Sequence, residues 1–144
     1  MGNYLNGLCK KCYQREKRIV MVGLDGAGKS SIMYSKFESS VVTVVPTIAF
    51  NVENILHLDT NLQIWDIGGQ SRVRTLWPYY IDEQSALVFV IDSADRDRLP
   101  EAIDELISLL SIPNISGVPL IVLAHKQDVP SALTVLEIIN ALPE

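Results

Sequence analysis

The sequence predicts an α/β domain whose sheet is mostly parallel. Continuous apolar runs alternate with helical patterns along the chain, which is typical of strands buried on both faces of such a sheet. A glycine-rich loop joins the first strand directly to a helix, and a short turn joins two later strands. Ligands of these sheets bind beyond the carboxyl ends of the strands, so the residues that follow each strand are the candidate site residues.

Residues 1–17 are predicted to form a basic amphipathic helix or arm. Apolar side chains recur on one helical stripe, at Tyr4, Leu5, Leu8, Cys9 and Cys12. Residues 1–18 carry a net charge of +4, whereas the whole chain carries −5, so the body is acidic. The arm either docks on the body or lies on an anionic membrane, and its basic flank favours the membrane. The acidic body argues against nucleic-acid binding.

Residues 18–144 form the predicted body, and its first half contains a strand, a helix and a hairpin. Residues 18–23 are apolar without polar alternation, which indicates a buried strand. The helix at 29–37 opens at the preceding glycines. Residues 49–67 read as two strands joined at Asp59-Thr60-Asn61, a hairpin turn signal, and they add an antiparallel strand at one edge of the sheet.

The second half of the body repeats the alternation of strand and helix. Residues 86–95 and 118–128 are predicted to be the second and third buried strands. A helix begins at Pro100 and continues through apolar residues at 103, 106, 107 and 110. The apolar pattern from Leu133 to Ile139 predicts a last helix that ends near Pro143.

Composition restricts the class of protein. The chain has 144 residues, 48% of them apolar and 20% charged, which fits one soluble domain. No stretch reaches the roughly 18 consecutive apolar residues of a membrane span, and no secretory signal is visible. Cys9 and Cys12 form a C-x-x-C pair to which His57 and His125 add no suitable zinc ligands. The two cysteines are surface thiols in a reducing cytosol or sites of reversible acylation.

The stretch GLDGAGKS, residues 23–30, has the pattern of a phosphate-binding loop after a strand and before a helix. Glycines let backbone N–H groups approach phosphate oxygens, and the helix N-terminus adds its positive dipole end. Lys29 is expected to reach the β- and γ-phosphates, and Ser30 to ligate Mg²⁺. An ATPase, a nucleotide kinase and a GTPase all remain compatible with this loop alone.

Two further stretches, each at the end of a predicted strand, indicate which reaction the site catalyses and which base it binds. In IWDIGGQ, Asp66 is expected to hold Mg²⁺ through a water, and the Gly-Gly pair to offer an N–H to a γ-phosphate. Gln70 is expected to orient the attacking water. In AHKQD, the carboxylate of Asp128 suits the adjacent N1–H and N2–H₂ donors of guanine, and the stem of Lys126 would lie over the base. The alternatives are an ordinary glycine turn and a solvated charged turn.

With these stretches in place, the chain resembles a small GTPase of the ADP-ribosylation-factor (Arf) and Arf-like family. GLDGAGKSS, PTIAFNVE, WDIGGQSRVRTLWPYY and AHKQD follow in the family's order and spacing over essentially all 144 residues. The resemblance implies a Ras-like phosphate-loop NTPase fold with helices on both faces of the sheet. The family continues beyond Glu144 with a further strand and a long helix, so a C-terminally incomplete domain is expected.

The resemblance also assigns roles to individual residues. Thr47 matches the switch I threonine that joins Mg²⁺, Gly69 the switch II glycine that senses the γ-phosphate, and Gln70 the catalytic glutamine. Phe50, Trp65 and Tyr80 match an aromatic trio used for effector contact, although ordinary packing would also explain them. The implied nucleotide-binding residues are Asp25, Gly26, Ala27, Gly28, Lys29, Ser30, Ser31, Thr47, Gly69, His125, Lys126 and Asp128.

The implied function is a GTP-binding switch that hydrolyses GTP slowly and recruits effectors at membranes in vesicle trafficking. The resemblance implies an exchange factor and a GTPase-activating protein as partners, and Mg²⁺ with GTP or GDP as ligands. It also implies a cytoplasmic protein that associates reversibly with the Golgi or another endomembrane. In the family the hairpin changes register between the GDP and GTP states, which releases the N-terminal helix.

Three positions depart from the family pattern. Gly2 invites myristoylation, but Asn6 stands where serine or threonine is usual. Ala49 replaces a switch I glycine, and its Cβ narrows the backbone conformations available there. His125 replaces the asparagine of the base motif. The alternative hypothesis is therefore an interaction module with impaired nucleotide binding; an ATP-using phosphotransferase is disfavoured by Gln70 and Asp128.

Overall fold

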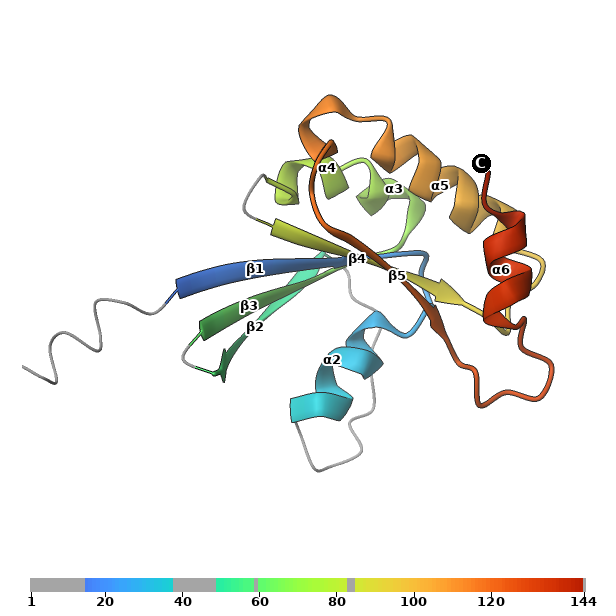
Figure 1. The fold of residues 1–144 in the computed structure, drawn as a ribbon, viewed down its shortest axis with the longest axis horizontal. Coiled ribbons are helices and arrows are strands. Elements are labelled where there is room, and N and C mark those ends of the chain that lie inside the picture. Colours follow the sequence, from blue (N-terminus) through green and yellow to red (C-terminus); the bar gives the residue numbers. More distant parts are fainter. Residues whose placement is uncertain (1–14, 38–48, 59, 83–84, 144) are drawn as a thin grey trace, which may run out of the picture.

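The computed structural model describes residues 15–37, 49–58, 60–82 and 85–143 (Figure 1). Its five strands are β1 (Arg15–Val22), β2 (Phe50–His57), β3 (Thr60–Ile67), β4 (Ser85–Asp92) and β5 (Leu120–His125). They form one sheet in the order β2-β3-β1-β4-β5. Only the β2–β3 pair is antiparallel. The predicted α/β class, with one antiparallel edge hairpin, is confirmed.

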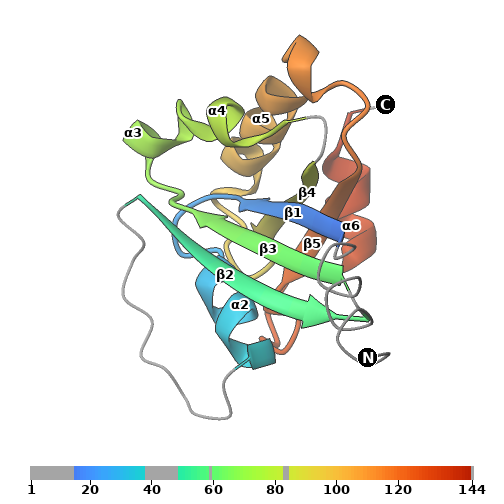
Figure 2. The same ribbon diagram turned by 90° about the vertical axis from the view of Figure 1, so that its left-hand side faces the viewer.

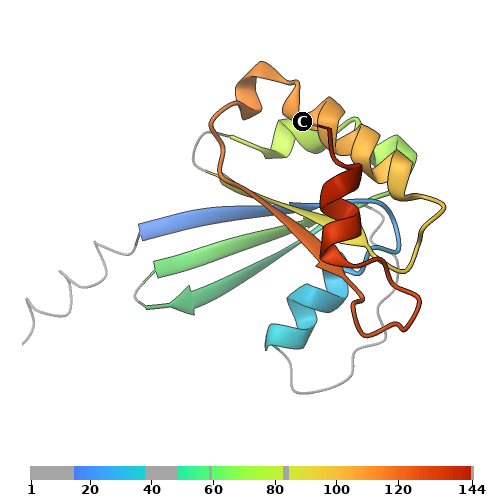
Figure 3. The same ribbon diagram turned by 45° about the vertical axis from the view of Figure 1, so that its right-hand side comes forward.

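Helices cover both faces of the sheet, as expected. Helix α2 (Lys29–Phe37) lies on one face, and α3 (Ser71–Arg74), α4 (Trp77–Tyr80) and α5 (Leu99–Leu110) lie on the other (Figures 1 and 2). Helix α6 (Val135–Ala141) lies beside β5 (Figure 3), and its Ile138 joins the core on the α5 face. A short 3₁₀ turn occupies Pro113–Ile115.

Two hydrophobic cores flank the sheet because the central strands present apolar side chains to both faces. The larger core includes Val20, Val22, Phe89 and Trp77, whose ring meets Phe89 edge-on at 6.1 Å. The smaller core lies under α2 and includes Met33. This double burial explains the unbroken apolar runs of β1 and β4, and it holds their carboxyl ends in fixed positions.

Several predicted boundaries were wrong by a few residues. β1 begins at Arg15, because Arg15, Glu16 and Lys17 continue the pairing with β3. Thr60 and Asn61, expected in the turn, are strand residues opposite His57 and Leu56. β4 ends at Asp92 rather than at residue 95, and β5 ends at His125 rather than at residue 128. The polar residues after each strand fold back as loops at the edge of the sheet.

β5 differs from the prediction in its burial. It was expected to be buried, yet Leu120, Ile121 and Leu123 are exposed by 36, 58 and 37%. The reason is position: in the described sheet β5 pairs only with β4. An apolar sequence alone therefore did not indicate which strand lies at the edge.

The last helix begins where the sequence supplies a capping box. The Thr134 hydroxyl accepts from the Glu137 N–H at 3.2 Å, and the Glu137 carboxylate accepts from the Thr134 N–H at 2.8 Å. This hydrogen bond from the Thr134 backbone lowers the pKa of Glu137. The cap fixes the end of the loop that follows β5.

Some predictions fall outside the described residues. One is the helix or arm predicted for residues 1–17, of which residues 1–14, with Gly2, Asn6, Cys9 and Cys12, lie outside the description. Its last three residues, Arg15, Glu16 and Lys17, are strand residues of β1 because they pair with β3, so the predicted boundary at residue 17 was wrong. The other is Thr47, which was expected to join Mg²⁺. Among the described residues, no helix has both the length and the apolarity needed to cross a membrane.

Candidate functional site

Four strand ends meet at one edge of the sheet. β1, β3, β4 and β5 are parallel to one another, so their carboxyl ends point the same way (Figure 1). Residues 23–28 follow β1, residues 66–70 end and follow β3, residues 93–95 follow β4, and residues 126–128 follow β5. The fold thus brings together the three stretches that the sequence singled out, and adds the end of β4.

The loop after β1 winds around the ammonium group of Lys29. Lys29 is the first residue of α2, and its Nζ donates to the carbonyls of Gly23 and Leu24, both at 2.9 Å. The side chain is 6% exposed. Within the loop, the Ala27 N–H donates a hydrogen bond to the Leu24 carbonyl at 3.3 Å, which forms a tight turn. A buried cation inside a ring of backbone groups at a helix N-terminus is suited to bind phosphate; Asp25, Gly26 and Ser31 are exposed around it.

Burial lowers the pKa of Lys29 from 10.5 to about 8, more than the nearby charges of Asp66 and Asp25 raise it. Between these two values the unfolded chain keeps a proton that the folded chain releases. Folding stability therefore increases as the pH rises through this interval.

We expect the free energy of unfolding to rise by about 3 kcal/mol between pH 8 and pH 10.5 through Lys29, because burial penalises only its charged form. Urea titrations across this range would measure the effect in the wild-type protein and in Lys29→Gln. The variant should lack this rise, and exposed Lys17→Gln should retain it. Identical pH profiles for wild type and Lys29→Gln would contradict the assignment.

Ser30 and Asp66 place oxygen atoms side by side below the loop. The Ser30 hydroxyl donates to Oδ2 of Asp66, whose side chain is fully buried at the end of β3. Hydroxyl and carboxylate oxygens are the ligands that hard divalent cations such as Mg²⁺ prefer, so this pair fits the expected metal. No cluster of three or more His, Cys, Asp or Glu side chains suited to a metal occurs in the described part of the chain.

Gly69 lies directly against the phosphate loop. A Cβ on Gly69 would lie less than 3.0 Å from backbone atoms of Gly23, Leu24 and Asp25, so only glycine fits. The neighbouring Gly68 N–H donates to the Ala49 carbonyl at 2.8 Å. The segment after β3 is therefore positioned by the loop after β1, which places the half-buried Gln70 beside that loop.

Arg74 fixes this segment from the other side. Its Nε donates to the Gly69 carbonyl at 2.7 Å, and its Nη1 contacts Glu101 at 2.6 Å and Glu105 at 3.0 Å on α5. Its Nη2 lies 3.5 Å from Asp25. A buried guanidinium thus joins the β3 end, the loop after β1 and α5.

The loop after β5 is tied to β4. Lys126, at a left-handed φ of 62°, reaches back so that its Nζ lies 2.5 Å from Asp92. Gln127 donates to the Ser93 hydroxyl at 2.8 Å and to the Leu133 carbonyl at 2.9 Å. Asp128 is exposed and makes no hydrogen bond or ion pair with the described residues. Its carboxylate can therefore receive donors from a ligand.

His125 joins this loop to the phosphate loop. Its Nδ1 lies 2.9 Å from the Ala27 carbonyl oxygen, across 98 positions of sequence. The ring also rests on Gly28, which has a φ of 95°; a Cβ there would lie less than 3.0 Å from the ring. The half of the site expected to hold a base is thus in contact with the half expected to hold phosphates.

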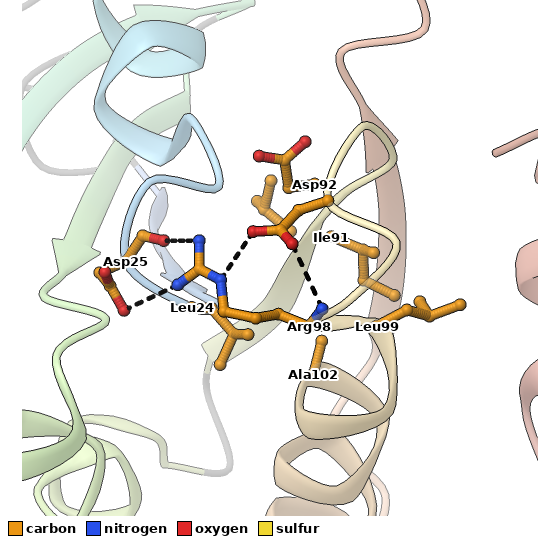
Figure 4. A pocket seen from close by; sticks show the side chains of 9 residues that line it. Leu24, Asp25, Ile91, Asp92, Arg98, Leu99 and Ala102 are labelled. Carbon is orange, nitrogen blue, oxygen red and sulfur yellow. Dashed lines mark hydrogen bonds and ion pairs between the residues drawn. The ribbon is translucent and has the colours of Figure 1, made fainter. Parts of the chain in front are cut away.

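A small, shallow hollow lies next to the phosphate loop, between the end of β4 and the start of α5 (Figure 4). Arg98 crosses it, with Nη2 3.3 Å from the Asp25 carbonyl and Nε 2.6 Å from Asp95. Hydrogen bonding to Arg98 lowers the pKa of Asp95. These contacts brace the loop rather than open a second site.

Phe50, Trp65 and Tyr80 form a cluster beside the β2–β3 hairpin. The ring centroids of Phe50 and Trp65 are 5.4 Å apart, and Tyr80 lies 5.5 Å from Phe50 and 5.9 Å from Trp65. Phe50 is 43% exposed, and the Arg18 guanidinium lies 5.2 Å from the Trp65 ring centre. The three aromatic residues that the resemblance implied are therefore adjacent and partly accessible.

Sequence reasoning missed Arg74, Arg98, Asp92 and Gln127. Arg74 lies between the apolar residues Val73 and Trp77, and a charge among apolar positions is a signal of a buried ion pair. Asp92 ends a buried strand at the edge where the other candidates converge. Arg98 and Gln127 carry no such signal, because the contacts that tie them to other strand ends, with Asp25 and Ser93, are distant in sequence.

Comparisons with known proteins give consistent results. The profile of the ADP-ribosylation factor family matches residues 3–144. ADP-ribosylation factor-like protein 1 of Drosophila melanogaster is 44% identical over 99% of this chain and 79% of its own. ADP-ribosylation factor K of Dictyostelium discoideum is 42% identical over 90% and 69%. The Arl6 BBS3 small GTPase of Trypanosoma brucei, solved with the nucleotide analogue GppNp, is structurally similar, with a TM-score of 0.77 and 30% identity over 87% of this chain and 76% of that one.

Proposed function

Because the chain belongs to the ADP-ribosylation factor family, we propose that it is a GTP-binding switch that hydrolyses GTP slowly. The single observation that carries this proposal is the meeting of three stretches at one edge of the sheet. The phosphate loop contacts Gly69 on one side and His125 on the other. One ligand with phosphates at Lys29 and a base at Asp128 would engage all three.

The phosphate half of this proposal relies on Lys29 and the backbone of residues 25–31. The nucleotide phosphates would take the place of the Gly23 and Leu24 carbonyls as partners of the Lys29 ammonium. Loop N–H groups and the N-terminus of α2 would hold the remaining phosphate oxygens. Because the fold already buries the ammonium, little further desolvation accompanies binding.

Ser30 and Thr47 would hold Mg²⁺ directly, and Asp66 through a water molecule. The closeness of the Ser30 hydroxyl to the buried Asp66 carboxylate supports the first and third of these roles. When bound, the metal would neutralise charge on the β- and γ-phosphates.

Hydrolysis would depend on Gly69 and Gln70. The Gly69 N–H would donate a hydrogen bond to the γ-phosphate. The Gln70 amide would orient the attacking water in line with the bond from the γ-phosphorus to its leaving oxygen. The Arg74 hydrogen bond to the Gly69 carbonyl fixes the peptide that precedes Gln70. These residues alone would support a slow intrinsic rate of hydrolysis. An activating protein that added a positive side chain would stabilise the charge of the transition state and accelerate hydrolysis.

The remaining parts of the proposal concern the membrane and partners. The Phe50, Trp65 and Tyr80 cluster, accessible at Phe50, would contact effectors. The basic arm, with an acyl chain at Gly2, would bind an endomembrane such as the Golgi reversibly, because one acyl chain alone binds membranes weakly. An exchange factor would load GTP, and the chain would act in vesicle trafficking.

Titration of the purified protein with labelled GDP, GTP and ATP in the presence of Mg²⁺ tests the proposal. We expect selective binding of GDP and GTP, and a loss of roughly 10- to 100-fold in their affinity in Asp128→Asn. The amide is uncharged, and it replaces one acceptor oxygen with an NH₂ donor that cannot pair with a guanine donor. Exposed Asp104→Asn is the matched control and should bind like the wild type.

A second candidate is an interaction module that binds nucleotide poorly. His125 in the base loop and Ala49 beside Gly68 favour it, because both replace residues typical of the family. The same titration separates the two: a folded sample that binds no guanine nucleotide would exclude the switch and leave the interaction module.

A further inference from the structure

The orientation of the His125 ring is set by its contact with the phosphate loop. The Nδ1–Cε1 edge of the ring lies against Gly28, and Nδ1 lies 2.9 Å from the Ala27 carbonyl oxygen. A carbonyl oxygen only accepts hydrogen bonds, so Nδ1 carries a hydrogen and donates it. The other ring nitrogen, Nε2, is then an acceptor in the neutral ring and a donor in the protonated ring.

The edge of guanine that faces His125 follows from the position of Asp128. A carboxylate only accepts, so Asp128 pairs with the N1–H and N2–H₂ edge. The remaining polar edge of guanine holds O6 and N7, which are both acceptors. His125 ends β5 and contacts the phosphate loop, whereas Asp128 lies three residues further along the loop. The O6 and N7 edge therefore faces the histidine side of the site.

We propose that His125 is a specificity-determining residue that binds the O6 and N7 edge of guanine through Nε2 only when the ring is protonated. The proposal rests on the guanine-nucleotide binding proposed above. A neutral ring presents an acceptor to two acceptors, which is unfavourable. A protonated ring donates a charge-assisted hydrogen bond while Nδ1 keeps its bond to Ala27. GDP and GTP therefore bind together with a proton.

Several charged groups lie on the elements around the ring. Asp92 lies opposite His125 in the pairing of β4 with β5, and its carboxylate is bound to Lys126. Asp128 lies in the loop that follows His125, and Lys29 follows Gly28 with its ammonium held by loop carbonyls. Lys29 and the phosphates of the nucleotide also exchange protons, so the test must isolate His125.

The test measures the dissociation constant of GDP with Mg²⁺ from about pH 5.5 to about pH 8. It uses the wild type, His125→Asn and His57→Asn. Asparagine offers an N–H₂ donor at every pH, and His57 is the other histidine of the chain, exposed on β2. We expect the ratio of wild-type to His125→Asn affinity to rise roughly 10- to 100-fold toward the acidic end. His57→Asn should follow the wild type.

A second measurement needs no substitution at His125. Ring resonances of the two histidines are titrated by NMR in the free and the GDP-bound protein, with His57→Asn to assign them. Proton-linked binding predicts that His125 titrates at a higher pH in the GDP-bound protein. A midpoint that stays the same or falls on binding would overturn the inference, as would parallel affinity curves for wild type and His125→Asn. Absence of GDP binding by every folded variant at every pH would instead overturn the proposed function.

Discussion

Lys29→Gln is expected to weaken the binding of GDP and GTP by more than about 100-fold while the fold stays intact. The reason is that the Lys29 ammonium is buried at the centre of the phosphate loop and donates to Gly23 and Leu24. A glutamine amide can still donate to these carbonyls, but it brings no charge to the phosphates. Fluorescence titration with labelled GDP measures the loss, and thermal unfolding checks the fold.

The matched control for this experiment is Lys17→Gln, at an exposed position of β1. It removes the same charge from the protein without touching the site, so its GDP affinity should stay within a few-fold of the wild type. If both variants lost affinity equally, net charge rather than the position of Lys29 would govern phosphate binding. If Lys29→Gln bound GDP normally, the loop after β1 would not be a phosphate site.

Gly69→Ala is expected to lower the rate of GTP hydrolysis by about 100-fold or more. Its methyl group would lie less than 3.0 Å from backbone atoms of Gly23, Leu24 and Asp25, which cannot move aside as a flexible side chain could. The segment after β3 must then withdraw from the phosphate loop. This removes the Gly69 N–H from the γ-phosphate and Gln70 from the attacking water. Single-turnover hydrolysis of bound GTP measures the effect.

Two further variants separate this mechanism from a general loss of stability. Gln70→Leu removes the water-orienting amide without adding a clash, and should lower hydrolysis while the segment stays in place. Gly117→Ala adds the same methyl group where nothing lies within 4 Å, but at a φ of 88° that strains an alanine backbone, so it costs stability without a clash in the site. Its hydrolysis rate should match the wild type. A Gly69→Ala protein with wild-type hydrolysis would contradict the role assigned to the contact between Gly69 and the phosphate loop.

Together these contacts connect both halves of the candidate site to the rest of the domain. Gly69 is held by the phosphate loop on one side and by Arg74 on the other, and Arg74 also contacts Glu101 and Glu105. A change in the phosphates would therefore reach α5 through the two partly buried ion pairs of Arg74. The base side is connected in the same way by the hydrogen bond between His125 and Ala27.

The main features of the fold could be predicted because they depend on local patterns. Unbroken apolar runs identified β1 and β4, and the glycine spacing of residues 23–28 identified the loop before α2. The exposure of β5 could not be predicted in this way, because it depends on which strands pair and not on composition. The hairpin turn was misplaced by two residues because Thr60 and Asn61 suit both a turn and a strand that is extended by pairing.

The sequence by itself determined the types of group in the site: a lysine after glycines, an aspartate and glutamine after β3, and an aspartate after β5. These follow from motifs whose chemistry is local. Only the tertiary structure decided how the groups meet. The packing of Gly69 on the phosphate loop, the burial of Arg74, and the contact of His125 with Ala27 join residues that are 5 to 98 positions apart. Such contacts arise when parallel strands place their carboxyl ends at one edge, and no spacing along the chain encodes them.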